Sequence, residues 1–179
     1  MYIWTGIIVE GQLGEVKTAS IEAEKKLNLQ PLFGFPMHVS VKISFFVPND
    51  KTKEVVDFLS EYFSSLKPFV IPVKAIELED TIVWVRMKEC DELKKIQSDM
   101  NRLLGEKFGV PVHEYDTDFK FHSTLCMADE KVAEAFYNEV KNTHVPSVLK
   151  AEKAGIAISE EWKPFGFKII KTIDFSGDK

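Results

Sequence analysis

Cysteines and long apolar runs are scarce in this chain. Its 2 cysteines, Cys90 and Cys126, are far apart and outside any CxxC spacing, which argues against a disulfide framework or a zinc-ribbon pattern. We therefore expect two reduced thiols in a cytoplasmic protein. No apolar run reaches the roughly 20 residues of a membrane span, so we expect no membrane partner. The opening MYIWTGIIVEG has no basic residue ahead of its apolar stretch, which is typical of a strand rather than of a signal peptide.

An excess of positive charge is also missing. The 179 residues include 23 Lys and Arg against 28 Asp and Glu, which gives a net charge of −5. Indiscriminate binding to long duplex nucleic acid depends on neutralising many phosphates, so this balance argues against it and leaves room for a small site that grips one or two phosphates. The length suits one ordinary domain with a hydrophobic core, or two small lobes. We expect a monomer with a single domain over residues 1–179.

What the chain does have is an order of helices and strands that repeats. Apolar residues at helical spacing predict helices over residues 15–29, 52–66, 91–108 and 129–142. After a first strand, the series helix, histidine strand, helix and strand pair occurs twice, and the second strand pair is expected over residues 148–159 and 165–175. The two histidines are 122 − 38 = 84 residues apart, and Trp84 and Trp162 follow them at similar offsets. This period is too long for a solenoid and indicates an internally duplicated α/β domain of two similar lobes.

Two of the four histidines sit in apolar, strand-like segments, FPMHVSVKISFF and DFKFHSTLCMA. Side chains at i, i+2 and i+4 of a strand share one face. The polar face of the first segment is therefore expected to carry His38, Ser40 and Lys42. The polar face of the second is expected to carry Lys120, His122 and Thr124. The opposite faces are apolar and suit a core, and duplication would bring the two polar faces together as the floor of one cleft.

Two imidazoles, two hydroxyls and ammonium groups suit a phosphodiester. One neutral histidine can remove a proton from the attacking oxygen, and the other, when protonated, can donate one to the leaving oxygen. Hydroxyls and lysines can stabilise the charge on the non-bridging oxygens during displacement. This chemistry requires no metal and no cofactor.

The motifs His38-Val39-Ser40-Val41 and His122-Ser123-Thr124-Leu125 resemble the paired His-x-Ser/Thr-x motifs of the two-histidine (2H) phosphoesterases. That superfamily includes 2′,5′-RNA ligase-like proteins, 2′,3′-cyclic nucleotide phosphodiesterases and a related domain of some eukaryotic anchoring proteins. The segment FKFHSTLCM most closely resembles the second motif of this last group. The resemblance implies an α/β (α+β) bilobal fold in which two antiparallel-rich sheets face a central cleft with helices on the outside. It also implies a metal-independent hydrolase or ligase in RNA processing, acting on a small nucleotide or RNA end, with His38, Ser40, His122 and Thr124 as the catalytic set.

Further candidates surround these motifs. Arg86 alternates with Trp84 on a strand and could reach a phosphate, and Tyr115 could stack on a base. Together with the two lysines, the expected substrate-binding residues are thus Lys42, Arg86, Tyr115 and Lys120. Aromatic candidates for base stacking are Trp4, Phe33, Phe35 and Trp162.

Two alternatives remain open at this point. The loop PVHEYDTDF offers His113, Glu114, Asp116 and Asp118, which with the two cleft histidines would make a metal-dependent hydrolase. Their spacing matches no compact ligand pattern, so a solvated loop is the preferred interpretation. The other alternative is a nucleotide- or RNA-binding module that uses the same cleft without turnover.

Overall fold

The computed structural model describes residues 1–29, 35–162 and 166–177. Its strands are β1 (Tyr2–Ile8), β2 (His38–Phe46), β3 (Phe69–Glu79), β4 (Ile82–Met87), β5 (His122–Met127), β6 (Val148–Ala151), β7 (Lys153–Ser159) and β8 (Lys168–Asp174). Its α-helices are α1 (Gly14–Lys26), α2 (Thr52–Ser64), α3 (Asp91–Phe108) and α4 (Glu130–Val140), and short 3₁₀ turns cover Asn49–Lys51 and Glu114–Asp116. None of the helices in these ranges is both long and apolar enough to cross a membrane.

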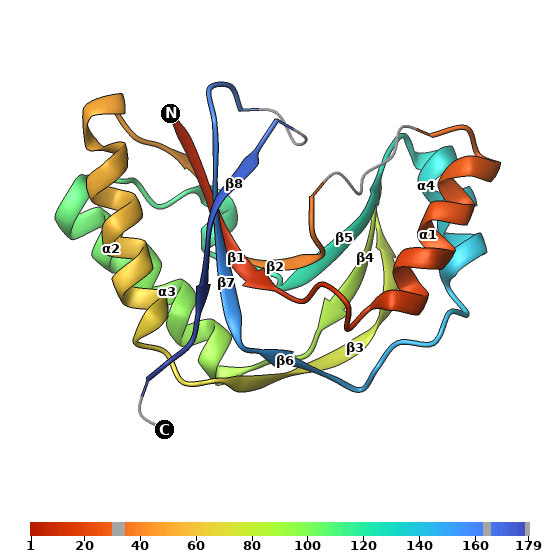
Figure 1. Ribbon diagram of the computed structural model, residues 1–179. Coiled ribbons are helices and arrows are strands. Elements are labelled where there is room, and N and C mark those ends of the chain that lie inside the picture. The colour runs from red at the N-terminus through yellow and green to blue at the C-terminus, as the bar shows by residue number, and fades with distance from the viewer. Residues whose placement is uncertain (30–34, 163–165, 178–179) are drawn as a thin grey trace.

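The strands form two four-stranded antiparallel sheets, in the orders β2-β1-β7-β8 and β5-β4-β3-β6. Helices α2 and α3 pack against the first sheet, and α4 packs against the second and contacts α1. The helices therefore lie on the outer sides of the molecule with the sheets between them (Figure 1). This arrangement confirms the α+β, bilobal fold that the sequence predicts.

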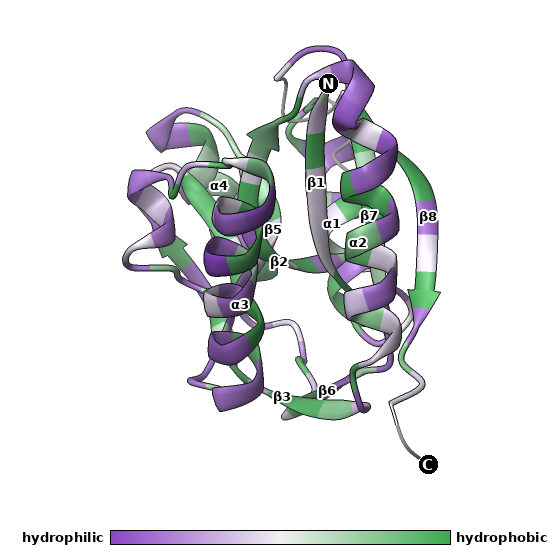
Figure 2. Cartoon of the chain, turned by 90° about the vertical axis from the view of Figure 1, so that its left-hand side faces the viewer, coloured by the Kyte–Doolittle hydropathy of each residue, from purple (hydrophilic) through white to green (hydrophobic). Residues whose placement is uncertain are grey.

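Each predicted helix is present, because the apolar spacing that predicts it also builds its buried face. Along α3 the buried side chains are Leu93, Ile96, Met100 and Leu104, and the helix ends where Gly109 takes a left-handed φ of 68° that glycine adopts without strain. At the start of α4 the carboxylate of Asp129 accepts a hydrogen bond from the backbone N–H of Val132 at 3.1 Å. Figure 2 shows hydrophilic and hydrophobic residues together on the helices, as expected for helices with one buried face.

The segment 148–159 departs from the prediction of one continuous strand. It divides at Glu152 into β6, which pairs with β3 in the second sheet, and β7, which pairs with β1 and β8 in the first. Buried and exposed residues continue to alternate in β6, so the periodicity of the sequence does not reveal the break. The chain crosses from one sheet to the other at this point, and each sheet is consequently built from both halves of the sequence.

Candidate active site

The two histidine strands lie beside each other at the centre of the molecule. β2 and β5 are both edge strands, one in each sheet, and they contact each other where the two sheets meet (Figure 1). His38 is opposite Ile8 in the β1–β2 ladder, and His122 is opposite Arg86 in the β4–β5 ladder. The two imidazoles are close enough for the charge of His38 to lower the pKa of His122. The structure therefore brings together the two histidines that the sequence predicts as a pair.

Both imidazoles are held by the same hydrogen bond. Nδ1 of His38 lies 2.8 Å from the carbonyl oxygen of Pro36, and Nδ1 of His122 lies 2.5 Å from the carbonyl oxygen of Lys120. A carbonyl oxygen can only accept, so Nδ1 carries the proton in each ring. In the neutral imidazole the lone pair then belongs to Nε2. Each ring is thereby oriented by the backbone two residues before it and keeps Nε2 for a proton transfer.

Burial sets the charge of the two rings. Desolvation lowers the pKa of His38 to about 4, and the bond to Pro36 opposes this only in part. Desolvation likewise lowers the pKa of His122 to about 4; the charges of His38 and Arg86 lower it further, while the Lys120 carbonyl and Glu79 raise it. Both histidines are therefore neutral at pH 7 in the free protein. Each ring can therefore accept a proton in the free protein. To act as a proton donor, a ring must first become protonated, and an anionic ligand bound beside it favours that protonation.

Each histidine packs against a tryptophan from the neighbouring strand. The ring centroids of Trp4 and His38 are 4.5 Å apart, and those of Trp84 and His122 are 4.3 Å apart. The tryptophan that packs against His38 as Trp84 packs against His122 is thus Trp4 on β1. Trp162, which the sequence offsets matched with Trp84, is 61% exposed. The prediction that matched Trp84 with Trp162 is wrong, because the first sheet uses β1 rather than a later strand beside its histidine.

The hydroxyl of Ser40 has a defined partner in the same pair of strands. Nε1 of Trp4 donates to Oγ of Ser40 at 2.9 Å, so the Ser40 proton is left to be donated to another acceptor. Thr124 follows its histidine by two residues, as Ser40 does, but it is opposite Trp84 in the β4–β5 ladder, whereas Ser40 is opposite Gly6. Nε1 of Trp84 is buried and has no hydrogen-bond partner among the described residues.

Glycines make the position of Trp4 possible. A Cβ on Gly6 would lie 2.6 Å from Cζ2 of Trp4 and 2.7 Å from the carbonyl oxygen of Val39, distances that real Cβ contacts do not reach. A Cβ on Gly155, opposite Gly6 in β7, would lie 3.3 Å from Cζ3 of Trp4. Sequence reasoning missed these residues, although glycine inside a strand is the usual signal of a close approach.

A small apolar cluster lies next to His38. Trp4, Ile8 and Ala157 form a small buried cluster, separate from the main core, against which Phe35, Phe167 and Ile169 pack. The ring of Phe35 is 5.1 Å from that of His38. Two of the aromatic residues proposed for base stacking, Trp4 and Phe35, thus lie beside the site. Phe33 lies outside the described residues.

Lys42 is the clearest correction to the predicted site. Gly6 is opposite Ser40 but the adjacent Thr5 is opposite Lys42, so Val41 is an extra residue on β2 and forms a β-bulge. The bulge ends the alternation of faces, and Val41 and Lys42 are both buried. Lys42 therefore does not share the polar face of His38 and Ser40, and the prediction that it binds substrate is wrong.

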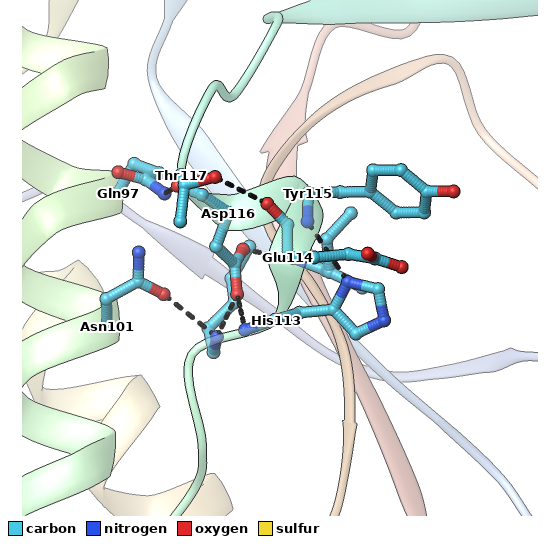
Figure 3. Close-up of polar contacts among 9 residues, drawn as sticks. Gln97, Asn101, His113, Glu114, Tyr115, Asp116 and Thr117 are labelled. Carbon is cyan, nitrogen blue, oxygen red and sulfur yellow. Dashed lines mark hydrogen bonds and ion pairs between the residues drawn. The ribbon is translucent and has the colours of Figure 1, made fainter.

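The side chain of Lys42 is instead 1% exposed and belongs to a buried network. Figure 3 shows Asn101, His113 and Asp116 of this network. Nζ of Lys42 lies 2.6 Å from Oδ2 of Asp116 and 2.9 Å from Oδ1 of Asn101 on α3. The Asp116 carboxylate also accepts from the backbone N–H groups of His113 and Ile43, at 2.9 and 3.1 Å. The network thus ties β2 to α3 and to the loop that leads into β5.

This network also answers the metal hypothesis. The metal-dependent alternative requires the acidic loop to lie beside the two histidines, but Asp116 of that loop is buried against Lys42. Tyr115 in the same loop is 67% exposed, with its ring 5.2 Å from that of His113. Among the described residues, no group of three or more His, Cys, Asp or Glu side chains is arranged to hold a metal ion. The loop is therefore not assembled with the histidines as a metal site.

The remaining two cations lie near His122. Lys120 forms an ion pair with Glu79, and its carbonyl holds the His122 ring. The guanidinium carbon of Arg86 lies 5.8 Å from the Trp84 ring centroid. Its Nη1 is buried without a hydrogen-bond partner among the described residues, which is a costly state for a charged donor.

Comparison with known proteins shows similarity of structure. No family model matches the chain, and no curated protein does. The structure is similar over 100% of both chains to TT0787 of Thermus thermophilus, with a TM-score of 0.60 and 17% identity. It is similar over 97% of both chains to E. coli LigT complexed with 3′-AMP (TM-score 0.54, 13% identity). It is also similar to Kluyveromyces marxianus Usb1 with uridine monophosphate, over 97% of this chain and 98% of that one (TM-score 0.53, 14% identity). The chain therefore has, along nearly its whole length, the fold of LigT and Usb1, which is the fold that the resemblance to the two-histidine phosphoesterases implied.

Proposed function

We propose that this chain is a metal-independent phosphoesterase that acts on a 2′,3′-cyclic phosphate or a 2′,5′-linked nucleotide end. The observation that carries the proposal is the matched pair of histidines. Both rings present an unprotonated Nε2, both are fixed by a backbone carbonyl, and both stand on adjacent edge strands. A structural histidine in a core has no reason to occur twice with the same tautomer and the same aromatic neighbour.

The proposed reaction uses one histidine as base and the other as acid. Nε2 of the neutral base takes a proton from the attacking water as its oxygen bonds to phosphorus. The P–O bond to the leaving ribose oxygen breaks, and that oxygen receives the proton of the acid histidine. The hydroxyls of Ser40 and Thr124 donate to the non-bridging oxygens.

The lowered pKa values of His38 and His122 fit this scheme when the anionic substrate is included. In the free protein both rings are neutral at pH 7, since their pKa values are about 4. A phosphodiester close to the rings favours the charged form of one of them, so substrate binding is expected to bring in the proton that the acid later donates. The same geometry serves either histidine in either role.

The ligands of the similar structures support a nucleotide substrate. One LigT structure was solved with phosphate and another with 3′-AMP, and one Usb1 structure was solved with uridine monophosphate. In this chain Phe35, which is half-buried and packs against Trp4, is the apolar aromatic side chain available to a base beside His38. We place the activity in the cytoplasm, where the free thiols of Cys90 and Cys126 would remain reduced, and expect the chain to act as a monomer.

The test is hydrolysis of a nucleoside 2′,3′-cyclic phosphate by the purified protein in excess EDTA. His38→Ala and His122→Ala are each expected to abolish turnover while the circular dichroism spectrum stays unchanged. His144→Ala is the matched control, because His144 is exposed and outside the site. Wild-type turnover in either site variant would refute the mechanism, and activity that is lost in EDTA and restored by metal would favour a metal-dependent hydrolase. Tight nucleotide binding without any product would identify a binding module instead.

A further inference from the structure

A cavity lies next to the beginning of β5, the strand that carries His122. It has a volume of about 370 Å³ and lies between the end of β4, the first turns of α3 and the loop that precedes β5. Its charged lining comprises Arg86, Lys88, Glu89, Lys94, Asp116, Asp118 and Lys120. Arg86 is opposite His122 in the β4–β5 ladder, and Lys120 holds the His122 ring through its carbonyl. Two residues of the cavity lining therefore adjoin His122.

The ion pairs in this cavity leave positive charge uncompensated. Lys94 pairs with Glu89 at 2.8 Å, Lys120 pairs with Glu79, and Asp116 pairs with Lys42 at 2.6 Å. In the described part of the chain, neither Arg86 nor Lys88 forms an ion pair, and the carboxylate of Asp118 has none either. Two cations thus face one carboxylate, so the cavity favours an anionic occupant.

Arg86 adds a requirement for a hydrogen-bond acceptor. Its Nη1 is buried without a partner among the described residues, and a buried guanidinium N–H without an acceptor destabilises the fold. The oxygens of a phosphate match the planar fork of a guanidinium better than any other common anion except a carboxylate. Because Arg86 lines the cavity, a phosphate bound there would place its oxygens beside this guanidinium.

We propose that this cavity is a subsite for a second phosphate, the one next to the phosphate that reacts between the histidines. The proposal rests on the proposed function and narrows its substrate class: the chain acts on the end of an oligonucleotide in preference to a mononucleotide. Lys88 and Arg86 bind the second phosphate, and Asp118 limits the affinity by repulsion. A mononucleotide fills the histidine site and leaves this subsite empty.

The test compares adenosine 2′,3′-cyclic phosphate with a trinucleotide that ends in the same cyclic phosphate. The wild type is expected to have a lower KM for the trinucleotide. Lys88→Ala is expected to raise that KM several-fold and Asp118→Asn to lower it, while the KM for the mononucleotide stays unchanged in both. Lys88 and Asp118 are exposed, so neither substitution is expected to disturb folding. Lys131→Ala, which removes an exposed charge on α4 outside the cavity, is the matched control.

Binding measurements keep this test independent of turnover. The Kd of a 3′-phosphorylated trinucleotide and that of 3′-AMP are measured by titration calorimetry in a series of salt concentrations. Loss of one phosphate contact in Lys88→Ala should reduce the slope of log Kd against log salt by about 0.7 for the trinucleotide and leave that for 3′-AMP unchanged. Equal effects on both ligands, or none, would overturn the subsite whether or not the protein hydrolyses them. A protein that binds the trinucleotide in this way but hydrolyses neither substrate would overturn only the proposed reaction.

Discussion

The two half-buried histidines of the site make the stability of this protein depend on pH in a defined window. The pKa values of His38 and His122 are about 4 in the folded chain and near 6.5 in an unfolded one. Between these values the unfolded chain binds protons that the folded chain does not, so the free energy of unfolding falls as the pH is lowered from 6.5 to 4. One pKa unit corresponds to about 1.4 kcal/mol, so each histidine accounts for roughly 3 kcal/mol once the pH is below 4.

The assay is urea unfolding followed by circular dichroism, at a series of pH values from 7.5 to 4.5. His38→Gln removes one titrating group and keeps an amide that can donate to the Pro36 carbonyl. Over this range the wild type should lose about 2 to 3 kcal/mol more than His38→Gln. Carboxylates with lowered pKa values, such as Asp57 and Asp99, also contribute at the acid end, but they cancel in the difference between the two proteins.

The exposed His144 provides the control for that experiment. His144→Gln makes the same substitution at a side chain that lies in solvent and outside the site. Parallel curves for the wild type and His38→Gln would refute the reasoning, since they would show that the His38 ring titrates alike in the folded and unfolded chains. The claim that both imidazoles are neutral in the free site would then fail with it.

Two further predictions concern stability at neutral pH. Lys42→Met should destabilise the fold by about 3–5 kcal/mol, because it leaves the buried carboxylate of Asp116 without its cation. Adding Asp116→Asn to this variant should restore most of the lost stability. If Lys42→Met alone unfolded at the same temperature as the wild type, the prediction would be contradicted. Gly6→Ala should cost about 1–3 kcal/mol, because its Cβ overlaps Trp4 and the backbone of β2. At Gly14 a Cβ would meet nothing within 4 Å, so the free energy of unfolding of Gly14→Ala should stay within about 1 kcal/mol of the wild-type value. Equal losses of stability at the two glycines would show that close approach to Trp4 is not the cause.

The features that the sequence predicted correctly depend on local periodicity. The four helices follow from apolar residues at a period of 3.6, and the two histidine strands from alternation at a period of 2. Duplication of the histidine motif then predicted which distant segments meet. The pairing of His38 with His122 could therefore be argued before any coordinates, because the motif occurs twice in the same structural context.

The features that the sequence did not predict depend on pairing between distant strands. The bulge at Val41 is a property of the ladder with β1, and nothing in VSVKIS marks it, so alternation placed Lys42 on the wrong face. The break at Glu152 arises because β6 finds its partner in β3 and β7 finds its partner in β1. Trp4 could be assigned to His38 only once β1 was known to be the neighbour of β2. Each of these requires the register between strands, which a single sequence does not contain.

The Lys42–Asp116 pair has a place in the fold that bears on the histidines. Lys42 follows His38 on β2, and Asp116 stands in the loop that leads to His122 on β5. The pair is almost fully buried, and an ion pair of this kind adds little net stability compared with apolar residues of similar volume. Its contribution is better understood as geometric: it joins the two strands at a fixed distance, with Asn101 of α3 holding the same ammonium group. If the double variant Lys42→Met with Asp116→Asn regained stability but lost turnover, the result would show that the reaction between the two imidazoles depends on the distance between these strands.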